Sequence, residues 1–361
     1  MSFGTHVLQR RGPRRWPPGI FGNSCNCSCS SGYNIKQFDN DSALAELARV
    51  DDGNATYSLE WNGTYLYSNY GAYTSGGGYI RAKSYDNAMA FVQSFTYTYS
   101  YAASGNRQRA MGICGDGTVC LNANRNTTVN RNSAVSRNSD DSADWETAID
   151  ATGSGMDAVA GDSSGNVYAL AQDTGGMVIY KFDSAGVKQW KTTIAVNRVP
   201  RGLLVDATGN IWAISQFTTT AYLDYITSAG AISTTVTIAN WNPGHFCTDG
   251  STGIWVSLFS TAFPTPATPE IRNYSSAGAL GTTITEADLF NSLLFHTGPV
   301  AFDGTDVVAV VRNSSLWKVR KYSTAGVVQW TSGDIGWTSL LAPFAIKADA
   351  NYIFVGGSYI P

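Results

Sequence analysis

A turn of the form Asp-x-x-Gly-Asn, with an apolar stretch on each side, recurs along the chain and constrains its fold more than any other feature. The clearest copies span residues 159–170 and 203–214, and looser ones span 59–67, 111–121, 246–257, 300–310 and 346–355. In such a turn the Asp side chain bonds the backbone just after it, and Gly takes the position that needs a positive φ. The turn residues 63, 117, 165, 209, 253, 304 and 350 are 44 to 54 residues apart. That spacing is typical of four-stranded propeller blades, which run at about 40–50 residues each.

A second pattern alternates with the first. It reads aromatic residue, small polar residues, Ala-Gly, apolar residue and Trp, as in residues 180–190 and 321–330. Weaker copies span residues 225–230, 274–278, 85–87 and 135–145. We expect this pattern to form the outer two strands of each sheet, with the Trp packed between neighbouring sheets.

The order of the two patterns predicts how the ring closes. A copy of the second pattern follows each of the first six copies of the first, whereas the seventh copy, near Asp349, has none after it. Its missing partner is residues 35–44. The last sheet therefore takes its outer hairpin from the N-terminal part of the chain and its inner one from the C-terminal part, which leaves no open edge. The predicted fold is all-β: a seven-bladed β-propeller at residues 33–361, closed two-plus-two by both termini and preceded by an extended basic arm at residues 1–32.

Two segments have a local preference that competes with this prediction. Residues 42–49 have good helix propensity and could form a helix in place of the closing outer strand. Residues 285–294 also look helical, with Thr285 as the N-cap, and would form an insertion between two sheets.

The charge is unevenly distributed. The whole chain carries −3 and the arm carries +4, from Arg10, Arg11, Arg14 and Arg15, so the remainder carries −7. A basic arm on an acidic body favours a docking segment for an acidic partner, with a solvated tail as the alternative. The charge of the body argues against nucleic-acid binding. No apolar run is long enough to span a membrane, and Pro17-Pro18 argues against a secretory signal.

The cysteines give little indication of a cofactor, and none is predicted. Cys25, Cys27 and Cys29 have a spacing that could serve metal binding or disulfides, but no His or fourth Cys stands beside them. Cys114 and Cys120 flank a Gly-Asp-Gly-Thr turn and could face each other across a hairpin. Two small apolar strand residues are the favoured interpretation of that pair.

Together the two patterns resemble the NHL-like and related propeller repeat families, a resemblance that covers residues 33–361 and is strongest over 156–330. It implies binding of partners or ligands on the faces of the disc. Sialidase-like propellers do not fit, because the stretch from Asp183 to Gly186 has one residue too many. Residues 201–212 are similar in style to streptogramin-lyase-like propellers, a resemblance that implies a cluster of His and Glu. The chain has only His6, His245 and His296, and no Glu adjoins the last two.

Residues just before the inner strands would line one mouth of the central channel. The candidates are Arg109, Asp157, Arg201, His245 and His296. They could form a mixed polar ring for a ligand, or simply be the residues at which the strands begin.

Three functions follow as hypotheses. The first is a non-enzymatic structural or adhesion protein, specifically a bacteriophage virion component that docks on other virion proteins through Arg10, Arg11, Arg14, Arg15 and Trp16. The second is a propeller that binds a host glycan or receptor. The third is a lyase or hydrolase that uses His245 and His296. The first implies a place in the virion, with the cytoplasm as the alternative.

Overall fold

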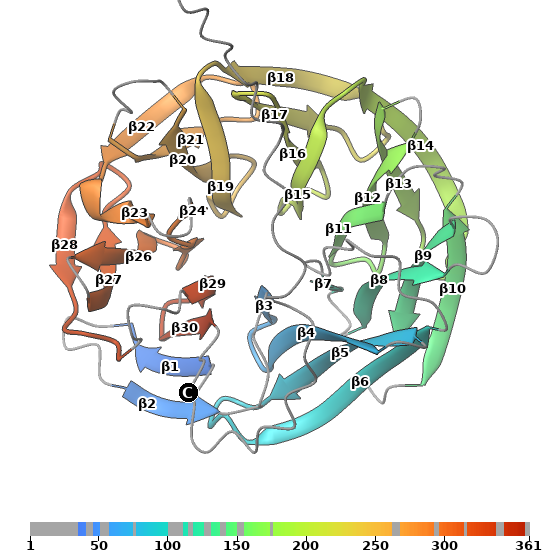
Figure 1. Ribbon diagram of the computed structural model, residues 1–361, viewed down its shortest axis with the longest axis horizontal. Coiled ribbons are helices and arrows are strands. Elements are labelled where there is room, and N and C mark those ends of the chain that lie inside the picture. Colours follow the sequence, from blue (N-terminus) through green and yellow to red (C-terminus); the bar gives the residue numbers. More distant parts are fainter. Residues whose placement is uncertain are drawn as a thin grey trace, which may run out of the picture.

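The computed structural model describes residues 35–40, 46–50, 58–74, 77–99, 111–114, 118–125, 131–137, 142–149, 155–173, 176–261, 268–291, 296–313, 316–336 and 343–357. These residues form seven four-stranded antiparallel sheets and one two-stranded sheet. The four-stranded sheets stand around a common centre as the blades of a propeller (Figure 1). The predicted arm, residues 1–32, lies outside the described residues. No helix in the described part of the chain is long and apolar enough to cross a membrane.

Six sheets are built from consecutive strands, the first of which is innermost (Figure 1). The first three comprise β3 (Ser58–Trp61), β4 (Leu66–Thr74), β5 (Gly77–Tyr85) and β6 (Phe91–Tyr99); β7 (Met111–Ile113), β8 (Val119–Arg125), β9 (Arg131–Arg137) and β10 (Ala143–Ile149); and β11 (Gly155–Gly161), β12 (Val167–Asp173), β13 (Gly176–Phe182) and β14 (Lys188–Ala195). The next three comprise β15 (Val199–Val205), β16 (Ile211–Phe217), β17 (Thr220–Ile226) and β18 (Ile232–Ile238); β19 (Trp241–Thr248), β20 (Ile254–Ser260), β21 (Glu270–Tyr274) and β22 (Leu280–Thr285); and β25 (Val300–Phe302), β26 (Val307–Asn313), β27 (Leu316–Tyr322) and β28 (Val328–Thr331).

The seventh sheet is shared between the two ends of the chain. Its strands are β1 (Ile35–Asp39), β2 (Glu46–Val50), β29 (Pro343–Ala348) and β30 (Tyr352–Gly357), in the order β2-β1-β30-β29. Strands β1 and β30 are antiparallel, with Ile35 opposite Gly356 and Asp39 opposite Tyr352. The predicted two-plus-two closure is confirmed. Residues 46–50 are the closing outer strand, so the helix considered for residues 42–49 is wrong over that part, because pairing with β1 outweighs the local propensity.

The inner turns have the chemistry that their sequence predicts. Asp206 Oδ1 accepts the backbone N–H groups of Thr208 and Asn210, at 2.8 and 3.0 Å. Gly209 in the same turn has a φ of +79°. Asp162 and Asn62 accept backbone N–H groups in the corresponding turns of other sheets. The side chain thus satisfies turn N–H groups that the sheet leaves unpaired.

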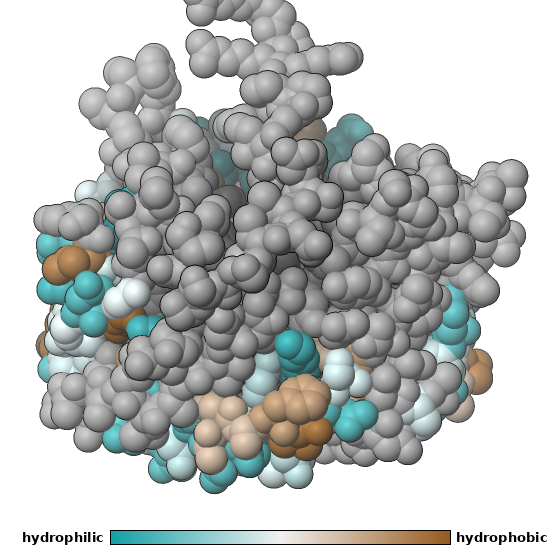
Figure 2. Space-filling view, turned by 60° about the horizontal axis from the view of Figure 1, so that its bottom comes forward, coloured by the Kyte–Doolittle hydropathy of each residue, from teal (hydrophilic) through white to brown (hydrophobic). Residues whose placement is uncertain are grey.

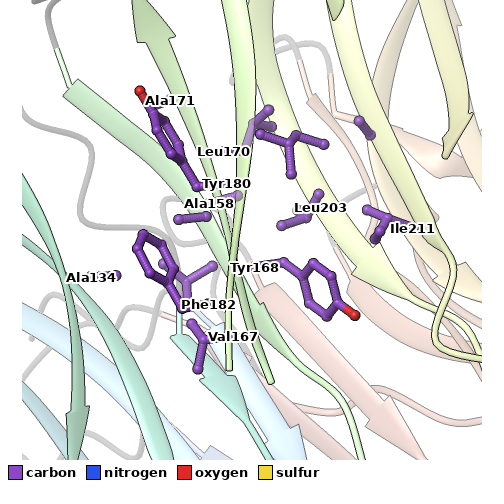
Figure 3. Close-up of a cluster of buried hydrophobic side chains, with 14 of the residues drawn as sticks. Ala134, Ala158, Val167, Tyr168, Leu170, Ala171, Tyr180, Phe182, Leu203 and Ile211 are labelled. Atoms are coloured by element: carbon purple, nitrogen blue, oxygen red, sulfur yellow. The ribbon is translucent and has the colours of Figure 1, made fainter. Parts of the chain in front are cut away.

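The core lies between the sheets, because each sheet is covered on both faces. Figure 3 shows this for β11–β14: Tyr168 lies on the side of Leu203 and Ile211, and Phe182 lies on the side of Ala134. All five side chains are buried. Burial on both faces explains why the second strands β12, β16, β20 and β26 begin with mostly apolar runs.

The predicted tryptophan contacts at the rim are confirmed at two seams between sheets. Trp145 of β10 donates its indole N–H to the carbonyl of Ser184 in the next sheet, at 3.0 Å. Trp190 of β14 makes the same contact with Ser228, also at 3.0 Å. The indole ring covers a glycine in each case, Gly186 and Gly230.

Over residues 285–291, the part that the structure describes, the insertion at residues 285–294 is not the helix that its sequence predicts. Thr285 ends β22, and only the 3-10 helix η1 (Ala287–Leu289) follows. The chain then forms β23 (Phe290–Asn291), which pairs with β24 (His296–Thr297). The side chain of Glu286, not Thr285, caps the short helix by accepting the Asp288 N–H at 3.0 Å. The N–H of Gly298 donates to the Leu289 carbonyl at 2.7 Å, and this bond folds the segment back before a longer helix can form.

Candidate functional site

One face of the disc carries the starts of the inner strands, and we call it the mouth face. Antiparallel order brings the end of each second strand to the same face, together with the start of each third strand. In β15–β18 these points are Val199, Phe217 and Thr220. Ile35 is the start of a third strand and lies opposite Gly356, so the first described residue of the closing sheet also lies on this face.

Arg201 is the predicted mouth residue with the most fully described surroundings. It is exposed, and its Nε and Nη2 donate to Gln216 Oε1, at 3.0 and 2.7 Å. Gln216 Nε2 in turn donates to the Thr218 carbonyl at 2.7 Å and to Asn242 Oδ1. Two neighbouring sheets thus hold the guanidinium of Arg201 in a fixed position on the mouth face.

Two other predicted mouth residues are less fully described. Arg109 lies outside the described residues. Asp157 is in β11 at an irregularity between Met156 and Ala158, and its side chain is outside what the structure describes. Strand β11 contacts β15, so the strands that carry Asp157 and Arg201 are neighbours.

The strands that carry His245 and His296 are neighbours. His245 lies in the irregular part of β19, where its N–H donates to Ser257 Oγ at 2.8 Å and its carbonyl accepts from the same hydroxyl at 3.1 Å. His296 is in β24 opposite Asn291, and β24 contacts both β19 and β20. The structure describes no side-chain position for His296.

The glutamates nearest the histidines in sequence are held by arginines that the sequence did not single out. Glu270 pairs with Arg272 at 2.6 Å. Glu286 pairs with Arg320 and accepts the hydroxyl of Tyr322. Burial and the neighbouring Glu286 carboxylate raise the pKa of Tyr322, so that hydroxyl stays protonated. Both carboxylates therefore have partners within the fold, and no group of three or more His, Cys, Asp or Glu residues that could hold a metal ion occurs among the described residues.

Three exposed apolar residues on or next to the strands that carry Arg201 and Gln216 also escaped the sequence analysis. Val196, Val199 and Phe217 are 64%, 40% and 44% exposed. Next to Phe217, Thr218 has a φ of +50° in a two-residue turn between β16 and β17, although such turns favour Gly, Asn or Asp. A β-branched residue in this conformation is strained, and strain of this kind is common where ligands bind. Five residues that read Gln-Phe-Thr-Thr-Thr gave no signal for the turn, because they contain none of the usual turn residues.

Comparison with known proteins yields likenesses in structure only. No protein-family model and no curated protein matches the sequence. The WD40 repeats of RRP9 superpose with a TM-score of 0.57 at 7% identity, covering 90% of this chain and 98% of that one. Virginiamycin B lyase from Staphylococcus aureus has a TM-score of 0.57 at 11% identity, covering 91% and 100%. A putative 6-phosphogluconolactonase from Bacteroides uniformis has a TM-score of 0.52 at 12% identity, covering 90% and 99%. At these identities the likenesses show the propeller fold alone, and the fold includes both enzymes and repeat proteins.

Proposed function

We propose that the protein is a non-enzymatic structural propeller, a virion component of a bacteriophage that docks on other virion proteins through residues 1–32 and displays the ring. The observation that carries the proposal is the position of β1. It lies between β30 and β2, and residues 35–357 complete all seven four-stranded sheets of the described chain. A segment that precedes β1 in the chain can bind a partner without breaking the hydrogen bonds of any sheet.

The composition of the arm supports a docking role. Arg10, Arg11, Arg14 and Arg15 supply four positive charges with no acidic residue among residues 1–32, and Trp16 adds a large aromatic surface. Arg and Trp are the side chains most enriched where protein interfaces gain most of their affinity. An acidic surface on a neighbouring virion protein would complement this arm, whereas the remainder of the chain is acidic.

Deletion of residues 1–30 tests the proposal. We expect the shortened protein to keep the circular dichroism spectrum and melting temperature of the full chain, but to be missing from assembled particles when these are analysed by mass spectrometry. A full-length control with the four arginines changed to Lys keeps the charge and should still be incorporated, though less efficiently. Normal incorporation of the deleted form would overturn the docking role.

A second candidate is a propeller that binds a glycan or receptor on its mouth face. The exposed side chains of Phe217 and Val199, on the two strands that carry Gln216 and Arg201, favour it together with the strained Thr218 turn. Phe217→Ala should then abolish binding on a glycan array or to host cells. Val187→Ala is the control. Val187 is 57% exposed, but it lies in the turn between β13 and β14, on the face opposite the mouth face.

A third candidate is a lyase, which the contact between β24 and β19 favours because it brings the strands of His296 and His245 together. The structures similar to this chain include a catalytically inactive histidine-to-alanine form of virginiamycin B lyase with quinupristin. Incubation with quinupristin, followed by mass spectrometry of the products, tests this candidate. Turnover that His245→Ala and His296→Ala both abolish would replace the structural proposal with this one.

A further inference from the structure

Two cysteine sulfurs meet in the core of the sheet β7–β10. Cys114 Sγ and Cys120 Sγ are 3.4 Å apart, and no disulfide joins them in the structure. Cys120 lies opposite Gly112 in the β7–β8 hairpin, and the N–H of Cys114 donates to the Thr118 carbonyl at 2.9 Å. The two cysteines are therefore diagonal neighbours on one side of the hairpin.

The surroundings hold the sulfurs in this arrangement. Cys114 and Cys120 are 1% and 0% exposed and belong to the apolar core shared with the next sheet. A Cβ at Gly161 would stand only 2.6 Å from Cys114 Sγ, so that sulfur occupies space that the glycine leaves open. An S–S bond is about 2.05 Å long, so the sulfurs need to approach by only about 1.4 Å to form one.

We propose that Cys114 and Cys120 are an oxidation site, at which a small peroxide converts the two thiols into an intrachain disulfide. The thiolate of one cysteine attacks a peroxide oxygen; an S–O bond forms, the O–O bond breaks, and the departing hydroxide becomes water on protonation. The second thiolate attacks the resulting sulfenic acid; the S–S bond forms, the S–O bond breaks, and a second water leaves. The thiols together lose two electrons and two protons, and hydrogen peroxide is reduced to two molecules of water.

The disulfide would strengthen the short inner strand of its sheet. Strand β7 has only three residues, and its one partner within the sheet is β8. A covalent bond across this hairpin restricts the unfolded chain and ties β7 to β8. Burial makes the reaction depend on small oxidants or on local opening, and we expect large disulfides such as oxidised glutathione to react much more slowly than hydrogen peroxide.

Peptide mapping of the full-length protein tests the proposal. The protein is treated with hydrogen peroxide, remaining thiols are alkylated, and the tryptic peptide 110–125 is weighed. To keep other thiols from competing, Cys25, Cys27 and Cys29 are changed to Ser. We expect this peptide to lose two hydrogen atoms and take up no alkyl group, and the oxidised protein to melt about 2–4 °C higher than the reduced one.

Cys247 provides the matched control. Burial raises the pKa of its thiol to about 12, and it has no cysteine beside it among the described residues. Cys247→Ala should leave the mass loss and the melting shift unchanged, whereas Cys114→Ala and Cys120→Ala should each remove both. The decisive sample is the protein that retains Cys114 and Cys120. If its peptide 110–125 still takes up two alkyl groups at a peroxide concentration that oxidises free cysteine completely, the proposal is wrong. Oxygen adducts without loss of both thiols would overturn it equally.

Discussion

The outer turn between β13 and β14 and the one between β5 and β6 share one geometry but differ in the residue at the left-handed position. In each, an aspartate, Asp183 or Asp86, accepts backbone N–H groups two and four residues later, at 2.8 to 3.0 Å. The left-handed residue is Gly186 in the first turn, at a φ of +77°, and Met89 in the second, at +59°. A left-handed methionine is uncommon, and the strain it brings needs compensation elsewhere.

What packs on each turn explains the difference. The indole of Trp145 lies over Gly186, where a Cβ would meet its ring at 2.5 Å. Met89 is 5% exposed and packs in the core cluster of Ile35 and Phe354, which belong to the closing sheet. At an ordinary seam the neighbouring sheet supplies the bulky side chain and the turn must leave space. At the closing seam the turn itself supplies the bulk and accepts the strain.

Gly186→Ala should have the largest effect on stability. It adds the cost of a left-handed Cβ and displaces the Trp145 ring, and we expect a loss of about 3 kcal/mol in the free energy of unfolding. Gly209→Ala is the matched control, because Gly209 has a φ of +79° and nothing within 4 Å of its Cβ position. That control should cost about 1 kcal/mol in a urea titration. Equal losses in the free energy of unfolding would show that the Trp145 indole does not require a glycine at position 186.

At Met89 we expect a glycine variant to be more stable than an alanine variant, the reverse of the usual order. Met89→Ala removes buried contacts and keeps the strain, for an expected loss of about 2–3 kcal/mol. Met89→Gly removes the same contacts but relieves the strain, so we expect it to be about 1 kcal/mol more stable than the alanine variant. Urea midpoints of the two variants decide this, and an alanine variant that is the more stable would refute strain at this turn.

Asp206 tests whether the inner turns depend on the same side-chain bonds as the outer ones. It is buried, and its Oδ2 accepts the Tyr225 hydroxyl at 2.6 Å in addition to the turn N–H groups. Asp206→Ala should lose about 2 kcal/mol, because these donors are left without an acceptor. Asp183→Ala, at the more open outer turn, should lose about 1 kcal/mol. Thermal unfolding of both variants would show whether burial makes the difference.

The other seam of the closing sheet should respond to pH. Asp303 is buried, which alone would raise its pKa, but bonds from Lys321 and from Asn40 of the closing segment lower it on balance. A lowered folded-state pKa means that the ionised side chain stabilises the fold. This contribution is complete above the ordinary carboxyl pKa of about 3.9 and is lost as the pH falls through that value toward the folded-state pKa. Asp303→Asn should therefore reduce the difference in urea midpoint between neutral and acidic pH, and an unchanged difference would contradict the assignment.

The repeated turns made the ring predictable, because the backbone of each turn favours Asp and Gly at fixed positions and the turns can therefore be recognised in the sequence. Tertiary pairing decided what local sequence could not: β1 draws Glu46–Val50 into a strand despite its helix propensity. Met89 and Thr218 gave no warning of a positive φ, because neither is a turn residue. At the mouth, the sequence singled out Arg201 because it precedes the apolar part of an inner strand, but the bonds that hold its side chain involve Gln216 and Asn242, which other strands supply. Contacts of that kind are visible only once the sheets are assembled.

The shared seventh sheet also delays the pairing of β1 during synthesis of the chain. Strand β1 ends at Asp39 and its partner β30 begins at Tyr352, so the ribosome must synthesise the six intervening sheets before the two strands can pair. At about 5–20 residues per second, the first hairpin must wait on the order of tens of seconds with one side unpaired. During that interval the incomplete ring can pair with other copies of itself, so we expect the yield of folded protein to be more sensitive to synthesis rate and to chaperones than its final stability suggests.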